Sequence, residues 1–273
     1  MSKTILITGA SSGIGKATAA LFAERGWNVV ATMRNPDDGA DLADRDNVVV
    51  AALDVLDGDS IEAAVSSALE RFGTIDVLVN NAGYGAYGPL EATPMATLRR
   101  QFDVNVFGLV ETMRAVLPAL RAQRSGVIIN ISSVGGRMAF PLGSLYHGSK
   151  WAVEGLSEAV HFELSVLGIR VKIVEPGGVN TDFAGRSFVF THDPGLTDYQ
   201  PLVDMATAAI DDAEQSGNQE PEEVAEVIFA AATDGTAQLR YVSGDGALDL
   251  LANRYSAEQD ERFVAGMRAQ FGM

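Results

Sequence analysis

The sequence of 273 residues contains no cysteine, and this absence excludes disulfide bonds, thiolate nucleophiles and zinc sites built from sulfur. Basic residues are scarce, because 20 Lys and Arg stand against 36 Asp and Glu, which gives a formal net charge of −16. A surface of that sign repels nucleic acid and anionic lipid, so we expect neither as a partner. The three histidines, His147, His161 and His192, lack the spacing of metal ligands, so we expect no metal site and structural roles for them.

Long hydrophobic runs are also missing. The longest stretch without a charged residue is 77–90, which is interrupted by Gly and Asn and is shorter than the roughly 18–20 residues needed to cross a membrane. Met1 is followed within two residues by an apolar, strand-like run and not by a basic and then apolar leader. We therefore expect a cytoplasmic protein without a membrane span.

A regular alternation of strand-like and helix-like segments runs through the chain. Short apolar runs are separated by segments with the spacing of an amphipathic helix, as for Ile14, Ala17 and Leu21. At least six such alternations with short connections predict one α/β domain over residues 1–273, a doubly wound parallel sheet (Rossmann fold) with helices on both faces. The expected strands are 4–8, 28–33, 48–55, 75–79, 127–131, 170–174 and 239–242, and the expected helices include 94–123, with a kink or break at Pro118, and 145–167.

Two segments lie outside this alternation. Residues 182–219 are rich in Phe, Asp and Thr and separate a strand end from the next helix. Because a long insertion in a compact domain is usually functional or mobile, we predict that 182–219 is a lid over the substrate. Residues 244–273 are predicted to form a C-terminal extension.

A glycine-rich turn follows the first expected strand and opens the first helix. Gly9, Gly13 and Gly15 allow tight turning and close approach of a ligand, while the helix N-terminus offers unpaired N–H groups and a partial positive charge. A pyrophosphate fits such a turn, although a turn without a ligand is the alternative. The spacing G-x-x-x-G-x-G also differs from the G-x-G-x-x-G of other dinucleotide folds.

The end of the second strand bears on which dinucleotide binds. Met33 stands where an acidic residue would bind the ribose 2′-hydroxyl, and Arg34 follows it. A guanidinium pairs well with a phosphate, so the sequence favours NADP(H) over NAD(H). The alternative is that Arg34 is a solvated loop residue and that Asp37 or Asp38 binds the ribose.

The clearest chemical signal is Tyr146 and Lys150, four residues apart on one face of a helix. Carbonyl reduction needs a proton delivered to oxygen as hydride reaches carbon, and a neighbouring ammonium is expected to lower the pKa of the phenol. The pair alone occurs by chance in many helices. Ser133, however, ends the fifth strand at the edge where ligands of parallel sheets bind, and Asn81 and Pro176 follow other strands at that edge.

Together these motifs resemble the short-chain dehydrogenase/reductase family in order and spacing, closely over residues 4–181. The matching positions are Thr8-Gly9-x-x-x-Gly13-x-Gly15, Asn80-Asn81-Ala82-Gly83, Asn105, Ser133, Tyr146-x-x-x-Lys150 and Pro176-Gly177. Residues 31–34 and 81–85 resemble the branch that holds hydroxysteroid and retinol dehydrogenases. The family commonly forms homodimers or homotetramers through its long helices, so the resemblance implies such an assembly.

The resemblance also implies roles. Tyr146 would be the general acid/base, Lys150 would lower its pKa and bind the nicotinamide ribose, and Ser133 would bind the substrate oxygen. Asn105 would hold a water that relays protons towards Lys150. The cofactor-binding residues would be Gly9, Ser12, Gly13, Ile14, Arg34, Asp54, Val55, Asn81, Ala82, Tyr146, Lys150, Pro176, Gly177, Val179 and Thr181.

The expected substrate crevice is walled by 84–89, 134–145 and the segment after Thr181, which supply many aromatic residues. An apolar pocket over a polar floor suits a hydrophobic ketone, aldehyde or alcohol. We therefore expect an NADP(H)-dependent oxidoreductase that acts on a small carbonyl or alcohol substrate. Two alternatives are an epimerase or dehydratase on the same scaffold and a dinucleotide-binding regulator without turnover.

Overall fold

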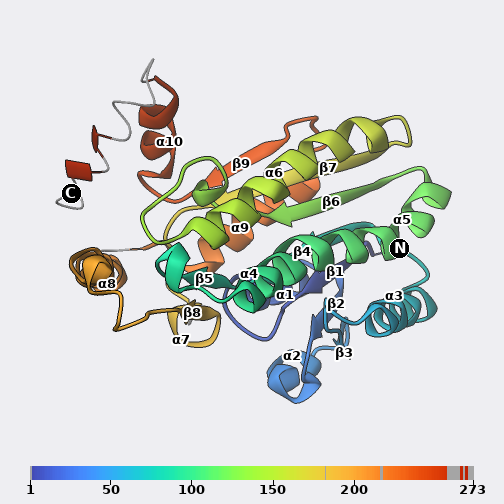
Figure 1. The fold of residues 1–273 in the computed structure, drawn as a ribbon. Helices are drawn as coiled ribbons and strands as arrows, with labels where there is room; N and C mark the ends of the chain where they lie inside the picture. Colours follow the sequence, from blue (N-terminus) through green and yellow to red (C-terminus); the bar gives the residue numbers. More distant parts are fainter. Residues whose placement is uncertain (1, 182, 216–217, 257–264, 267, 270–273) are drawn as a thin grey trace.

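A seven-stranded sheet forms the centre of the computed structural model, which describes residues 2–181, 183–215, 218–256, 265–266 and 268–269 (Figure 1). The strand order is β3-β2-β1-β4-β6-β7-β9, and each neighbouring pair is parallel. The predicted doubly wound parallel sheet is thus confirmed. The strands of this sheet are β1 (Thr4–Thr8), β2 (Asn28–Met33), β3 (Val48–Ala52), β4 (Val77–Asn80), β6 (Gly126–Ile131), β7 (Ile169–Pro176) and β9 (Arg240–Ser243).

Helices cover both faces of the sheet. Alternate residues of β1 point to opposite sides, so Ile5 packs in one apolar core and Leu6 in another. The first core contains residues of α1 and α9, and the second contains residues of α3, α5 and α6. The helices are α1 (Gly13–Glu24), α2 (Ala40–Ala43), α3 (Gly58–Phe72), α4 (Met95–Phe102), α5 (Gly108–Gln123), α6 (Ser144–Ser165), α7 (Phe183–Arg186), α8 (Gln200–Gln215), α9 (Pro221–Thr233) and α10 (Ala247–Ser256).

The helix expected over 94–123 is interrupted at a different place from the one predicted. A π-helical segment, Asp103–Phe107, separates α4 from α5, whereas Pro118 lies inside α5. Proline is tolerated there because Pro118 is exposed, so the carbonyl that loses its partner can bond to water. The break at Asp103–Phe107 turns Asn105 into the buried interior, as π-helical turns at functional sites often do.

A second, two-stranded sheet was not predicted. β5 (Gly85–Tyr87) pairs in parallel with β8 (Phe188–Phe190), so residues from the expected lid attach to the loop after β4. Each strand has only three residues, too few for an alternation of polar and apolar side chains to be seen in the sequence. Within the described ranges, the model contains no helix that is long and apolar enough to span a membrane.

Candidate active site

The carboxyl ends of the parallel strands bring the predicted site residues to one edge of the sheet. Gly9 follows β1, Asn81 follows β4, Ser133 comes shortly after β6, and Gly177 follows β7. Because neighbouring parallel strands end at the same edge, segments that are far apart in the sequence meet there (Figure 1). This edge is the candidate active site.

The glycine-rich turn is built for a close ligand. Gly9 and Gly13 have positive φ of 69° and 52°, a conformation that favours glycine. A Cβ at Gly15 would lie 2.3 Å from the carbonyl oxygen of Gly9, so a larger residue would force the turn open. Ser12 caps α1 without a side-chain hydrogen bond, and the first turn of this helix has no acidic residue. The helix N-terminus thus keeps its favourable potential for an anion.

Side chains from β1 and from the end of β4 fix the turn in place. The Nδ2 of Asn81 donates to the carbonyl oxygens of Thr8 and Gly9, each at 2.9 Å. The Oγ1 of Thr8 accepts from the backbone N–H groups of Asn81 and Ala82, each at 3.0 Å. This role of Thr8 was not predicted, and its place directly before Gly9 is the signal that could have shown it.

The remaining cofactor positions lie around this turn. A Cβ on Gly13 would lie 3.1 Å from Cγ2 of Thr181, so the segment after β7 reaches the turn. At the end of β2, Met33 is buried and Arg34 is exposed. Asp38 lies 3.7 Å from the guanidinium of Arg186. The other predicted cofactor residues, Ile14, Asp54, Val55, Pro176, Gly177 and Val179, occupy the N-terminal turn of α1, the loop after β3 and the end of β7 with the residues that follow it.

Tyr146 and Ser133 meet at the middle of the site. The Ser133 side chain hydrogen-bonds the Tyr146 phenol. Burial raises the pKa of Tyr146, and the bond to Ser133 opposes that shift. The net shift of the phenol pKa is thus upward, whereas a downward shift was expected from the sequence; the effect of Lys150 on this pKa stays a prediction. The phenol accordingly stays protonated and can act as a proton donor.

Lys150 lies buried next to this pair, 8% exposed. Its Nζ donates to the carbonyl oxygen of Ile131 at 2.8 Å and lies 5.8 Å from the centre of the Tyr146 ring. Burial lowers the pKa of Lys150 to about 8, while the charge of Glu154 acts in the opposite direction. An ammonium has three donors, so two remain for other acceptors.

Asn105 is held rigidly, 2% exposed. Its Oδ1 accepts from the N–H of Tyr84 at 3.0 Å, and its Nδ2 donates to the carbonyl oxygen of Tyr84 at 2.9 Å and to Oγ of Ser149 at 3.1 Å. Asn105 therefore joins the π-helical segment to the loop after β4 and to α6. Ser149, between Tyr146 and Lys150 in sequence, is a partner that the motif analysis did not single out.

A buried group of charges lies behind Lys150. Glu154, one turn further along α6, accepts from Nε of Arg240 at 2.9 Å. Glu175, at the end of β7, accepts from Arg137 at 3.2 Å and lies 3.3 Å from Nε of Arg240. Desolvation raises the pKa of Glu175 to about 7, with the charge of Glu154 adding to this shift. The i, i+4 spacing of Lys150 and Glu154 was visible in the sequence, whereas the approach of Glu175 depends on the fold.

Aromatic rings line the substrate side. Tyr87 stacks on Tyr146 with ring centres 5.5 Å apart, and Phe188 of β8 lies 5.1 Å from Tyr87 on the facing strand. Phe190 stacks on Phe188 at 6.3 Å. Tyr199, in the segment after Thr181 that was expected to wall the crevice, donates to Glu91 at 3.0 Å. The other rings form an apolar cluster that includes the ring of Tyr146.

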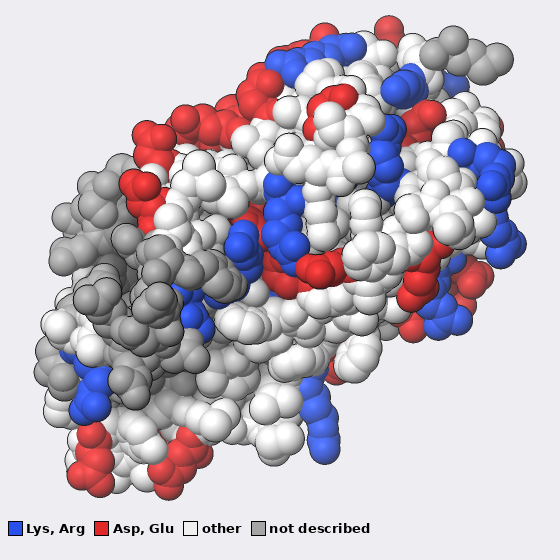
Figure 2. Space-filling view, turned by 90° about the horizontal axis from the view of Figure 1, so that it is seen from above, with Lys and Arg blue, Asp and Glu red and all other residues white. Residues whose placement is uncertain are grey.

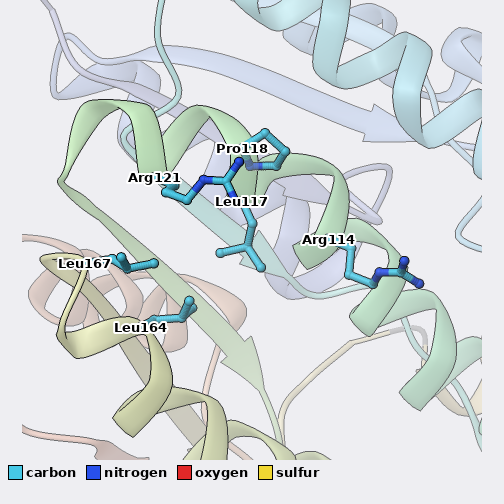
Figure 3. A pocket seen from close by; sticks show the side chains of 6 residues that line it. All are labelled: Arg114, Leu117, Pro118, Arg121, Leu164 and Leu167. Carbon is cyan, nitrogen blue, oxygen red and sulfur yellow. The ribbon is translucent and has the colours of Figure 1, made fainter.

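A hollow elsewhere on the molecule is separate from this site. It lies between α5 and the end of α6 and is lined by Arg114, Leu117, Pro118, Arg121, Leu164 and Leu167 (Figure 3). With a rise of about 1.5 Å per residue, Leu164 lies roughly 27 Å along α6 from Tyr146.

Over the part of the chain that the structure describes, no group of three or more His, Asp or Glu could hold a metal ion.

Comparison with known families gives a match over most of the chain. The family model described as short chain dehydrogenase matches residues 3–189. An uncharacterized oxidoreductase of Schizosaccharomyces pombe is 41% identical over 246 residues, covering 88% of this chain and 100% of that protein. The 3-ketodihydrosphingosine reductase of Bacteroides thetaiotaomicron is 39% identical, covering 78% and 77%. Retinol dehydrogenase 8 of Bos taurus is 36% identical, covering 83% and 76%.

Solved structures agree with this match. A short-chain dehydrogenase from Streptomyces avermitilis has a TM-score of 0.84 and 35% identity, covering 95% of this chain and 94% of that one. A short chain dehydrogenase/reductase from Burkholderia phymatum in complex with NAD has a TM-score of 0.81 and 27% identity, covering 93% of each chain. An alcohol dehydrogenase from Thermococcus sibiricus complexed with 5-hydroxy-NADP has a TM-score of 0.74 and 26% identity, covering 89% and 97%.

Proposed function

Because the chain belongs to the short-chain dehydrogenase family and is an oxidoreductase of that family, we propose that it interconverts a ketone or aldehyde with an alcohol, using NADP(H) and Tyr146 as general acid/base. The observation that carries this proposal is the hydrogen bond between Tyr146 and Ser133 beside the buried Lys150. In carbonyl reduction, Ser133 and Tyr146 hydrogen-bond the substrate oxygen, and the protonated phenol gives up its proton as charge develops on that oxygen. The phenolate left behind is stabilised by the ammonium of Lys150.

The residues at the glycine-rich turn fit a dinucleotide. The positive φ of Gly9 and the absence of room for a Cβ at Gly15 bring backbone close to a ligand, and the N-terminus of α1 faces it. When bound, a nicotinamide supplies or accepts the hydride. The donors of Lys150 not used by Ile131 would hold the nicotinamide ribose, and Asn105 would hold a water on the proton path towards Lys150.

The choice of NADP(H) rests on Arg34, because the related structures carry either NAD or an NADP derivative. Arg34 is exposed at the end of β2, the preceding Met33 is apolar and buried, and Asp38 already lies near Arg186. We expect Arg34→Ala to lower kcat/KM for NADPH by about 10- to 100-fold and to change it less than about twofold for NADH, since charge-assisted bonds to the 2′-phosphate are lost. Steady-state kinetics with both cofactors measures this.

Two controls belong to this measurement. Arg34→Lys keeps the positive charge but cannot form bidentate hydrogen bonds to a phosphate, so its kcat/KM for NADPH should lie between those of the natural chain and Arg34→Ala. Arg71→Ala removes an exposed arginine at the end of α3 and should leave both values unchanged. Equal losses with NADPH and NADH in Arg34→Ala would contradict the assignment.

We propose a hydrophobic carbonyl or alcohol as the substrate. The ring contacts of Tyr87 with Tyr146 and Phe188 support this, because an apolar wall binds apolar groups and excludes water. Two relatives are named for retinol and for 3-ketodihydrosphingosine, which is consistent with such a substrate.

We further propose that the segment 182–219 is a lid that orders over bound substrate. Its β8 strand already pairs with β5 beside Tyr146, and Arg186 is the only Lys or Arg in the segment. Trypsin can therefore cut the segment only after Arg186. With NADPH and a ketone inhibitor both bound, we expect cleavage there to slow at least about fivefold, because protease acts on the open form.

Fragment masses identify the cut, and Arg186→Gln should abolish that fragment while leaving the others. An unchanged cleavage rate at Arg186 in the presence of both ligands would refute the lid.

We also propose a cytoplasmic homodimer or homotetramer that associates through α5 and α6. Helix α6 exposes the large apolar side chains of Trp151 (47%) and Phe162 (66%), and Phe107 (58%) is exposed directly before α5. The hollow between the two helices has an apolar floor flanked by Arg114 and Arg121 (Figure 3).

Nucleic acid remains an unsuitable partner at a net charge of −16, and the face in Figure 2 shows Lys and Arg in small groups between Asp and Glu.

A further inference from the structure

His147, the neighbour of Tyr146, has a buried imidazole that uses both of its ring nitrogens. Its Nδ1 lies 3.0 Å from the carbonyl oxygen of Gly135, and its Nε2 accepts the backbone N–H of Phe140 at 3.1 Å. A carbonyl oxygen can only accept and a backbone N–H can only donate, so Nδ1 carries the proton and Nε2 carries none. The two contacts together require a neutral imidazole in a single tautomer.

The loop 134–143 wraps around this ring. A Cβ on Gly135 would lie 2.6 Å from Nδ1, and a Cβ on Gly143 would lie 2.5 Å from Nε2. The backbone N–H of His147 also donates to the carbonyl oxygen of Gly143 at 2.8 Å. The glycines near both ends of the loop therefore leave the space that the imidazole fills.

The same loop shapes the substrate side of the site. It begins directly after Ser133, whose Oγ accepts from the N–H of Gly135 at 3.0 Å. Near its other end, Leu142 has a positive φ of 61°, a strained conformation for leucine, and its carbonyl oxygen accepts from the N–H of Gly88 at 2.8 Å. The imidazole thus holds a loop that joins the Ser133 end of the site to the strand that carries Tyr87.

We propose that His147 is a positioning residue: its neutral imidazole holds the loop 134–143 in the shape that admits the substrate, and a proton gained at Nε2 releases Phe140 and loosens the loop. The identity of the substrate rests on the proposed function, whereas the tautomer and the contact with Phe140 do not.

The surroundings of the ring make the neutral form stable near neutral pH. Burial lowers the pKa of His147, and the bond to Gly135 opposes this shift. Tyr87 and Tyr146 face the ring with centres at 6.1 Å and 5.5 Å, and burial raises the pKa of each phenol, so both stay neutral in acid. Arg137, in the loop itself, donates to Glu175. His147 therefore gains its second proton at a lower pH than an ordinary histidine does, and the effect of that proton grows as the pH drops.

The first test needs no enzymatic activity. In protein labelled with ¹⁵N-histidine, the imidazole signal that disappears in His147→Gln identifies His147. We expect this signal to show a protonated Nδ1 and a bare Nε2 at pH 7.5, and we expect the amide resonance of Phe140 to shift along the titration curve of this imidazole. Two results would overturn the proposal, whatever the protein catalyses. One is a proton on Nε2 in place of Nδ1, and the other is a Phe140 amide chemical shift that does not change along the titration of the imidazole.

The second test measures the ratio of the substrate KM at one pH unit below the midpoint of this NMR titration curve to the substrate KM at pH 7.5. For the natural chain we expect a ratio of about five or more, because one hydrogen bond to the loop is lost, with a smaller change in kcat and no comparable change in the cofactor Kd. His147→Gln offers an acceptor that does not titrate, so its ratio should fall to about one. His161→Gln, the same substitution on α6 away from the loop, should keep the ratio of the natural chain.

If the KM ratio of His147→Gln equals that of the natural chain, another group causes the acid sensitivity, and the proposed role of His147 is wrong. If no carbonyl compound is turned over, the NMR arm still decides whether the imidazole holds Phe140, so failure of the proposed function and failure of this inference are distinguished.

Discussion

Tyr146→Phe is expected to lower kcat for carbonyl reduction by about 10²- to 10⁴-fold, the usual contribution of a positioned general acid. The substitution removes one oxygen and keeps the ring, so the stack on Tyr87 at 5.5 Å remains. Cofactor binding should change little, because Tyr146 is one of many expected cofactor-binding residues and the glycine-rich turn is left intact. Oxidation of NADPH with a panel of apolar ketones, together with the cofactor Kd from fluorescence titration, measures both quantities.

Tyr87→Phe is the matched control for this prediction. It removes the phenol oxygen of a second buried tyrosine in the same stack, and burial keeps the pKa of Tyr87 well above its ordinary value, so its oxygen is a poor proton source. We expect less than a tenfold loss of kcat. Similar losses in both variants would indicate that the stack, and not proton transfer from Tyr146, limits turnover.

Lys150→Met is expected to lower kcat/KM by at least about 10²-fold. Methionine is of similar length but has neither the charge that stabilises the phenolate nor the donors for a ribose. Because burial lowers the pKa of Lys150 to about 8, the natural enzyme should lose kcat/KM as the pH rises through about 8, where the ammonium loses its proton. The pH profile of kcat/KM from pH 6 to 10 shows this decline.

In Lys150→Met the decline near pH 8 should be absent from the residual activity. Lys3→Met changes an exposed lysine at the opposite end of β1, near Trp27, and should leave the profile unchanged. A decline that persists in Lys150→Met would show that a different group titrates there.

The fold was predictable because its signals are local and repeated. Each long strand is an apolar run bounded by turn residues, and the apolar spacing of helices such as α1 marks one buried face. The break at Asp103–Phe107 was not predicted, since the segment itself contains no proline or glycine and depends on the bonds of Asn105 to Tyr84 and Ser149. The pairing of β5 with β8 joins segments about 100 residues apart, and no local pattern specifies such a pairing.

The sequence placed the candidate site residues at one edge of the sheet, where the structure brings them together, but it did not predict the electrostatics of the site. The spacing of Tyr146 and Lys150 is set by the helix, whereas the direction of the Tyr146 pKa depends on burial that only the fold determines. Glu175 and Glu154 come close because the end of β7 lies under α6. His147 was expected to have a structural role. That both of its ring nitrogens are hydrogen-bonded becomes visible only once the loop 134–143 is folded around the ring.

The most direct test of the central claim is a crystal structure of the protein with NADPH and an unreactive ketone analogue. We predict that the phenol oxygen of Tyr146 lies within about 3 Å of the ketone oxygen, that Ser133 contacts the same oxygen, and that Nζ of Lys150 reaches the nicotinamide ribose. A Tyr146 hydroxyl turned away from the ketone, or a Lys150 that remains remote from the ribose, would contradict the account.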